Sequence, residues 1–315
     1  MRARLPELER LGVTALWLSP VYEAPDDDLG YAVTDYFRVR DAWGSMGSFR
    51  ALVGEAHARG MKVMLDFVPN HSSDEHRYYR HAERFGRRSP YYGFYERDAE
   101  GRPTHYFDWE HLPNLDYDDP AVRRWMTEAF AFWTRELDVD GFRVDAAWGV
   151  HERAPGFFAE LREELERIEP RVALVAEASA RRSTYVEGGF DAAYDWTEEV
   201  GQWAWRDVFD GGRADLSALH EALRGPGERV LRFLDDNDTG ERFATRHGEG
   251  LERVASALLF TVPGIPALFT GQEVGARYHP RPAARAARLH AGPRSLRPLP
   301  PPRRAAAHRA RARAR

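Results

Sequence analysis

Residues 62–71 read KVMLDFVPNH, and three later stretches share its plan of an apolar run that leads into acidic residues. These later stretches are GFRVD at 141–145, VAE at 175–177 and FLDDND at 233–238. Short apolar runs of this kind indicate buried strands, and carboxylates at the C-terminal ends of parallel strands lie where barrel enzymes keep their catalytic groups. Four such motifs in order predict an α/β barrel with an acidic site at one end.

The rest of the chain alternates strand-like and helix-like segments, which indicates an α/β fold with a parallel sheet. Seven strands are predicted, at residues 14–18, 62–67, 141–144, 172–176, 191–194, 230–234 and 266–269. Helices are predicted near residues 1–10 and at 48–59, 120–137, 156–168, 216–223 and 252–259. In the segment 120–137, apolar residues spaced three and four apart form one face, which is typical of a helix packed on a core.

The motifs resemble those of the α-amylase family of glycoside hydrolases and transglycosylases, over residues 11–275. Further matches are GY at 30–31, TDY at 34–36, LPNLD at 112–116, PGIP at 263–266 and GQE at 271–273. The resemblance implies a (β/α)8 TIM-type barrel with a small irregular insert after the third family strand. We therefore expect a catalytic barrel of residues 1–70 and 114–276, and an inserted subdomain of residues 71–113.

The two ends of the chain depart from the family pattern. The family implies one more strand before the helix near residues 1–10, so the barrel is expected to lack its first strand. In residues 277–315, twelve of thirty-nine positions are Arg and none is Asp or Glu. This composition predicts a disordered tail in place of the family's C-terminal β-sandwich. Both features suggest truncation at both ends, or an out-of-frame reading after Gly275.

The insert is rich in aromatic residues and shows no long helical pattern. A segment of this length without regular structure is usually functional in a compact domain, and the resemblance places it beside the substrate cleft. Aromatic rings can stack on sugar rings, but most of these are expected to form the insert's own small core. They are Tyr78, Tyr79, Tyr91, Tyr92, Phe94, Tyr95, Tyr106, Phe107 and Trp109.

Composition restricts the classes of function. The chain has no cysteine, which excludes thiol catalysis and disulfides. It has no apolar run of membrane-spanning length, and its N-terminus lacks the apolar core of a signal peptide, so a cytoplasmic protein without a membrane partner is the default expectation. Residues 1–276 are acidic overall, which suits a neutral sugar and argues against nucleic-acid binding. The arginine-dense segment 303–315 leaves a nucleic-acid binder as a further alternative.

Two carboxylates fit the chemistry of a retaining glycosidase, which needs a nucleophile and an acid/base about 5–5.5 Å apart. Asp145 is the expected nucleophile, because Arg143 lies two residues earlier on the same face of a strand and can hold it ionised. Glu177 is the expected acid/base, with a pKa raised by a dry cleft among other carboxylates. The resemblance gives Glu177 the same role and makes Asp238 the third carboxylate, which binds sugar hydroxyls and helps to distort the ring.

Further substrate contacts follow from the resemblance. Tyr31 and His71 are similar to the family's stacking tyrosine and its histidine at the subsite where the bond breaks. Asn237 stands where the commonest pattern has a histidine; its amide can donate a hydrogen bond to a sugar hydroxyl but cannot titrate. We expect altered or reduced transition-state stabilisation from Asn237, and Arg143 completes the substrate-binding set.

No cofactor is expected to be required, and a structural calcium ion remains open. The family's calcium site draws on an asparagine, on acids of the insert and on a carbonyl oxygen. Asn70 matches the asparagine, but Asn114 replaces the usual acid, and residues 146–149 lack the usual basic residue or histidine.

Ala146 and the LPNLD motif resemble family members that act on α-1,4 links. The expected function is a retaining α-glycosidase that acts on α-1,4-linked glucans or maltooligosaccharides by double displacement. A transglycosylase or isomerase of the same family, for example a trehalose-forming one, and a catalytically inactive gene fragment remain as alternatives.

Overall fold

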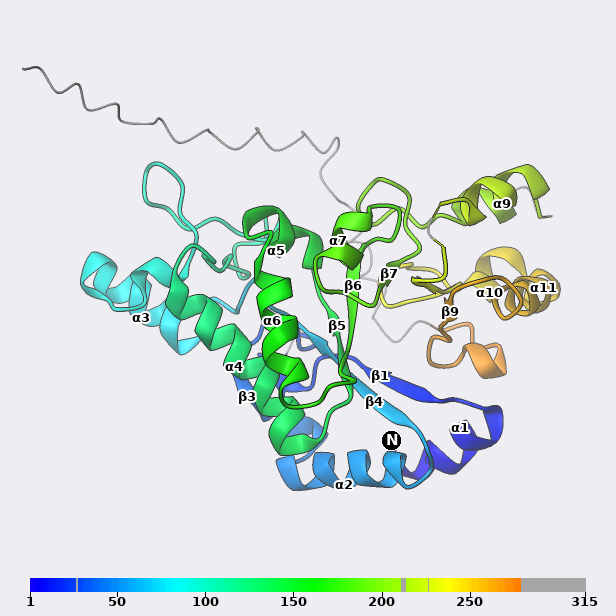
Figure 1. The fold of residues 1–315 in the computed structure, drawn as a ribbon, viewed down its shortest axis with the longest axis horizontal. Coiled ribbons are helices and arrows are strands. Elements are labelled where there is room, and N and C mark those ends of the chain that lie inside the picture. Colours follow the sequence, from blue (N-terminus) through cyan, green and yellow to red (C-terminus); the bar gives the residue numbers. More distant parts are fainter. Residues whose placement is uncertain (27, 211–213, 226, 279–315) are drawn as a thin grey trace, which may run out of the picture.

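The computed structural model describes residues 1–26, 28–210, 214–225 and 227–278. Its centre is one curled sheet of seven parallel strands in the order β1-β4-β5-β6-β7-β8-β9, packed by helices (Figure 1). The strands are β1 Ala15–Leu18, β4 Lys62–Phe67, β5 Gly141–Val144, β6 Ala173–Ser179, β7 Ala192–Tyr194, β8 Val230–Arg232 and β9 Ile265–Pro266. The predicted α/β fold of TIM-barrel type is confirmed, and every predicted strand is present.

The helices follow the predicted alternation with the strands. They are α1 Leu5–Leu11, α2 Met46–His57, α3 Arg77–Phe85, α4 Pro120–Leu137, α5 Ala147–Arg153, α6 Phe157–Glu166, α7 Ser183–Glu187, α8 Arg206–Phe209, α9 Leu216–Leu223, α10 Phe243–His247 and α11 Glu249–Leu259. Short 3-10 turns span Arg2–Arg4, Asp41–Trp43, Gly86–Arg88, Tyr92–Phe94 and Gln272–Val274. A two-stranded hairpin, β2 Tyr22–Glu23 and β3 Asp35–Val39, follows β1. No helix in the described part of the chain is long and apolar enough to cross a membrane.

Helix α4 shows how local sequence and core packing agree. The Asp119 carboxylate accepts a hydrogen bond from the Ala121 amide at 2.8 Å, and Pro120 occupies the first turn, where its missing N–H costs nothing. The apolar face is buried as predicted: the ring of Phe130 stacks on Phe67 of β4 with centroids 3.7 Å apart. The sheet and α4 therefore share one aromatic core.

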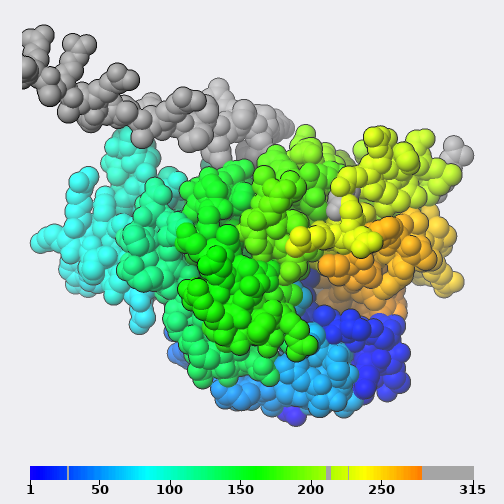
Figure 2. All heavy atoms as spheres, viewed as in Figure 1, coloured from blue at the N-terminus to red at the C-terminus, as the bar shows by residue number. Residues whose placement is uncertain are grey.

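The sheet curls but stays open within the described residues, because β1 pairs with β4 alone and β9 pairs with β8 alone. Its two ends nevertheless approach each other. Arg4 Nη2 lies 3.6 Å from Glu273 Oε1, and the space-filling view shows the dark blue N-terminal segment beside the orange C-terminal part (Figure 2). Ile265 of β9 is 44% exposed, as expected for a strand at an open edge.

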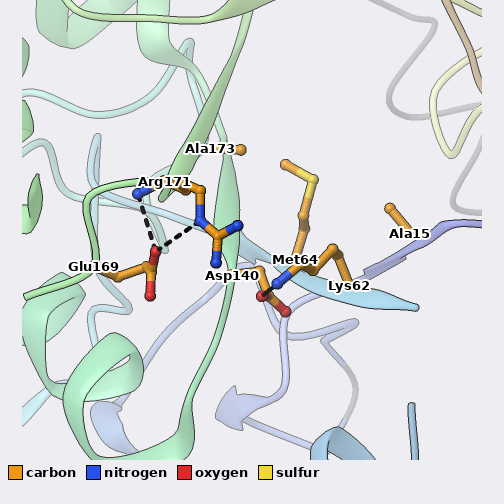
Figure 3. A pocket seen from close by; sticks show the side chains of 7 residues that line it. All are labelled: Ala15, Lys62, Met64, Asp140, Glu169, Arg171 and Ala173. Atoms are coloured by element: carbon orange, nitrogen blue, oxygen red, sulfur yellow. Dashed lines mark hydrogen bonds and ion pairs between the residues drawn. The ribbon is translucent and has the colours of Figure 1, made fainter. Parts of the chain in front are cut away.

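A cavity of about 220 Å³ lies among the N-terminal ends of β1, β4 and β6 (Figure 3). Its lining residues are Ala15, Lys62, Met64, Asp140, Glu169, Arg171 and Ala173. The Lys62 ammonium contacts the Asp140 carboxylate at 2.6 Å. This cavity is at the opposite end of the strands from the acidic motifs, so it is not the expected catalytic site.

The insert departs from the expectation of a purely irregular segment, because it contains helix α3. The His76 ring accepts a hydrogen bond from the Tyr78 amide at 3.1 Å and caps the helix. Tyr78 stacks on Tyr91 with centroids 4.0 Å apart and meets Trp125 of α4 edge-on. The helix escaped prediction because aromatic rings take the place of the aliphatic residues that usually mark a buried face.

The predicted tail at 277–315 lies outside the described residues, apart from its first two positions.

Candidate active site

One arginine joins the carboxylates at the ends of three neighbouring strands. The register pairs Asp66 of β4 with Arg143 of β5. Arg143 Nη1 donates to Asp66 Oδ1 at 2.7 Å and to Asp145 Oδ1 at 2.8 Å, and Nη2 lies 2.7 Å from Glu177 Oε1. All four side chains are buried. The structure therefore brings three of the predicted site residues, Arg143, Asp145 and Glu177, into one cluster.

Asp145 follows β5 directly and is held by both its backbone and its side chain. Its amide donates to the carbonyl oxygen of Phe67 at 2.7 Å, which extends the pairing of β4 and β5 by one residue. Its carboxylate contacts the Arg143 guanidinium, whose charge stabilises the ionised form. Both contacts fix the direction in which the carboxylate points.

Burial raises the pKa of Glu177 well above its ordinary value. The Arg143 charge opposes this rise, while the negative charges of Asp145 and Asp238 add to it. A carboxyl group in such surroundings keeps its proton to higher pH, which is what a general acid requires.

Ala146 adopts a left-handed backbone conformation with φ 44° and ψ 36°. For a residue other than glycine, this conformation costs about 1–2 kcal/mol. The Ala146 amide thereby donates to Glu177 Oε2 at 2.6 Å. The sequence alone suggested no contact between Ala146 and Glu177, because the two residues lie 31 positions apart.

Asp66 lies in the same cluster, although the sequence analysis did not single it out as a candidate site residue. The Tyr31 hydroxyl donates to Asp66 Oδ2 at 3.0 Å, and Asn237 Nδ2 donates to the Tyr31 hydroxyl at 2.7 Å. Burial raises the pKa of Asp66 to about 7, with Arg143 opposing the rise. A chain of hydrogen bonds thus joins Asn237 after β8 to the cluster on β4 and β5. The signal that could have identified Asp66 is its position on β4, opposite Arg143 of β5.

Asp238 lies in a turn that Asp236 organises. Asp236 Oδ1 accepts from the amides of Asp238 and Thr239 at 2.8 and 2.7 Å. Burial raises the pKa of Asp236 to about 7, and the adjacent Asp238 charge adds to the rise. The predicted third carboxylate is half-buried and close enough to raise the pKa of Glu177.

His71 is buried and electrically neutral. Burial lowers its pKa to about 3, and the charges of His111 and Arg153 add to the effect. Its ring stacks on Tyr106 of the insert with centroids 4.9 Å apart. The structure therefore places the predicted His71 at the start of the insert, packed against one of the insert's aromatic rings.

Tyr106, Phe107 and Trp148 form an aromatic wall next to the carboxylates. Burial raises the pKa of Tyr106, and the charges of Glu177, Asp145 and Asp238 add to the rise. The Trp148 ring lies 6.2 Å from Tyr106 and 6.0 Å from Phe107, between centroids. Phe107 is 38% exposed and has a positive φ of 50°. The sequence did not single out Trp148 as a candidate, since its contact with the insert depends on how the chain folds.

The residues around Asn70 do not fit a calcium ion. Asn70 Oδ1, the oxygen that a hard cation would use, accepts a hydrogen bond from Arg153 Nη2 at 2.8 Å. Asn70 Nδ2 donates to Asn114 Oδ1 at 3.2 Å. The described residues also contain no group of three or more His, Cys, Asp or Glu side chains placed to hold a metal.

Comparison with known proteins agrees with the motifs and the fold. The family model described as the alpha amylase catalytic domain matches residues 1–187. The chain is 34% identical over 280 residues to the alpha-amylase MalA of Haloarcula japonica, covering 87% of this chain and 41% of that protein. It is 31% identical over 288 residues to neopullulanase 2 of Thermoactinomyces vulgaris, covering 86% of this chain and 48% of that protein.

Among solved structures, a cyclomaltodextrinase superposes with a TM-score of 0.76 at 28% identity, covering 88% of this chain and 50% of that one. The chain therefore spans about half the length of the relatives it matches.

Proposed function

Because the chain belongs to the α-amylase family, we propose that it is a retaining α-glycosidase that cleaves α-1,4-linked glucans or maltooligosaccharides. The observation that carries the proposal is the cluster in which Arg143 contacts both Asp145 and Glu177. An ionised nucleophile beside a carboxyl group of raised pKa is the pair that double displacement requires. Its substrate is an α-glucan or oligosaccharide, with no nucleic-acid or membrane partner.

In the first step, protonated Glu177 gives its proton to the oxygen of the glycosidic bond while an oxygen of Asp145 attacks the anomeric carbon. The bond to the leaving sugar breaks, and a covalent glycosyl ester forms on Asp145. Arg143 keeps Asp145 ionised before the attack and stabilises Glu177 once it has lost its proton.

In the second step, ionised Glu177 takes a proton from water, and the water oxygen attacks the anomeric carbon and releases Asp145. The ester carries no charge, so the repulsion from Asp145 that raises the pKa of Glu177 in the free enzyme is removed. The pKa of Glu177 therefore falls in the intermediate, which suits its change from acid to base.

Substrate contacts come from both the barrel and the insert. Asp238 and neutral His71 offer hydrogen bonds to sugar hydroxyls, and the aromatic wall offers faces on which sugar rings can stack. Asn237 gives one amide hydrogen to Tyr31 and retains a second for a sugar hydroxyl. Transfer to a second sugar would use the same groups, since only the acceptor differs from hydrolysis.

The test is to incubate the purified chain with maltooligosaccharides, to follow new reducing ends, and to separate the products by chromatography. We expect Asp145→Asn to lower the rate by about 10⁴-fold, as for other catalytic residues that act as a unit. Products longer than the substrate would identify transfer. A folded wild-type chain that releases no reducing ends and makes no longer products would support the inactive alternative.

A further inference from the structure

The junction between the barrel and the insert contains a cation that belongs to the protein itself. Asn70 follows β4 where the insert begins, Asn114 lies where the insert ends, and Arg153 is the last residue of α5. We infer that the Arg153 guanidinium holds this junction in place of a calcium ion, so that the folded state does not depend on calcium. This inference concerns stability and does not rest on the proposed function.

Both oxygens of Asn70 face N–H donors. Arg153 Nη2 donates to Asn70 Oδ1 at 2.8 Å and approaches the Asn70 carbonyl oxygen at 3.4 Å. The same carbonyl oxygen accepts from the Leu115 amide at 3.0 Å. A calcium ion binds only through oxygen atoms, usually six to eight of them. It would have to displace the guanidinium to gain either oxygen of Asn70.

Glu96 is the acidic residue nearest to Asn70 in this hydrogen-bond network, and its carboxylate already accepts other hydrogen bonds. Glu96 Oε2 accepts from the Thr104 hydroxyl at 2.6 Å and from Asn114 Nδ2 at 3.4 Å. Asn114 in turn links Glu96 to Asn70, since its Oδ1 accepts from the Asn70 amide at 3.2 Å. Among the contacts of the described residues, the Asn70 side chain is therefore held by the Asn114 amide and the Arg153 guanidinium, and the Glu96 carboxylate reaches Asn70 only through Asn114.

Gly149 allows α5 to lie against Asn70. A Cβ atom at position 149 would come 2.8 Å from Asn70 Oδ1 and 3.6 Å from Arg153 Nη1. Glycine is disfavoured inside a helix, so its presence in α5 has a packing reason. The close approach leaves Asn70 buried between α5 and the Arg153 guanidinium, so the guanidinium would have to move before an ion could reach Asn70 Oδ1.

The positive charge of Arg153 also affects the pKa values of neighbouring residues. It adds to the effect of burial in lowering the pKa of His71, the first residue of the insert, and it opposes the rise that burial causes in the pKa of Tyr117. A divalent cation added next to a fixed guanidinium would be repelled by it. Charge and contacts therefore agree that one cation occupies this position.

The test measures thermal unfolding of the whole chain in excess EDTA and in excess CaCl₂, with a calorimetric titration of CaCl₂. We expect the same Tm in both solutions and no saturable binding heat. We expect Arg153→Met to lower the Tm by about 4 °C in both, the loss of a charged hydrogen bond in a chain of this size. The matched control is Arg135→Met at the end of α4, where Arg135 makes an exposed ion pair with Glu128 and the shift should stay below about 1 °C.

Two further variants cover the case in which Arg153→Met does not fold. Arg153→Lys keeps the charge but loses the planar fork, so its Tm should fall by less than that of the Met variant. Gly149→Ala should also lower the Tm, because it displaces Asn70 from Arg153. A wild-type Tm that drops in EDTA and recovers with CaCl₂ would overturn the inference, as would Arg153 variants no less stable than Arg135→Met.

Discussion

The two halves of the sheet hold the candidate site by different means. On the β4–β6 side, each pair of strands matches over four positions, and Arg143 draws the carboxylates of all three strands together. On the β8–β9 side, only two positions are paired, and Asp238 follows in a turn closed by the side chain of Asp236. The difference shows that strand register fixes Asp145 and Glu177, whereas local hydrogen bonds fix Asp238.

The largest effect is expected on the strand-held side, from Glu177→Gln. Loss of the acid/base should lower hydrolysis of maltooligosaccharides by about 10⁴-fold. Because the pKa of Glu177 is raised, the wild-type rate should fall at high pH as the acid loses its proton, at a pH well above the usual glutamate range. A plot of steady-state rate against pH should show this fall at high pH, the alkaline limb, in the wild type. The alkaline limb should be absent in Glu177→Gln.

The matched control is Glu252→Gln, because Glu252 of α11 is also buried and also has a raised pKa. It should keep both the rate and the alkaline limb. If the limb persists in Glu177→Gln, the titrating acid is another group and the role of Glu177 is wrong.

A smaller effect is expected on the turn-held side, from Asp236→Ala. The Asp238 and Thr239 amides would lose their shared acceptor, and a misplaced catalytic-site group costs about 10²-fold in rate. We expect kcat/KM to fall by about that factor, and the Tm to fall by only a few degrees, because one buried acceptor shared by two amides is lost. Circular dichroism melts and initial rates on the same preparation would check both parts.

Asp215→Ala provides the comparison, because Asp215 makes the same kind of contact, accepting from the Ser217 and Ala218 amides at the start of α9. This variant should weaken α9 slightly and leave kcat/KM unchanged. Equal losses in the two variants would mean that the effect is general loosening rather than misplacement of Asp238.

The same contrast explains what the sequence could predict. The bounds of β4, β5 and α4 follow from short buried runs and from the Asp-Pro start of α4, so local chemistry and packing agree there. Strand β9 was predicted at 266–269 but is Ile265–Pro266, because at an open edge little burial fixes its length. Local pattern is a reliable guide only where tertiary packing reinforces it.

The candidate site divides in a similar way. The carboxylates could be proposed from their positions at strand ends, and their roles stay predictions. The left-handed turn at Ala146, the wall position of Trp148 and the contact of Arg153 with Asn70 depend on how α5 approaches β4 and the insert. Residues far apart in sequence make those contacts, so no local sequence pattern predicts them.

The smallest effect is expected at the link between the two sides, from Asn237→Ala. The Asn237 amide donates to the Tyr31 hydroxyl, which donates to Asp66 on β4. Loss of one such hydrogen bond should lower kcat by about three- to tenfold. An unchanged kcat would contradict both this link and the expected role of Asn237 in transition-state stabilisation.

A double-mutant cycle with Tyr31→Phe separates two ways in which Asn237 can act. If Asn237 works by orienting the Tyr31 hydroxyl, adding Asn237→Ala to Tyr31→Phe should cause no further loss, and the two effects will not be additive. If its second amide hydrogen binds the sugar directly, the two losses should multiply. The first result would mean that the turn after β8 reaches the cluster of carboxylates through Tyr31 and Asp66, so that the strand-held side of the sheet helps to position the turn-held side.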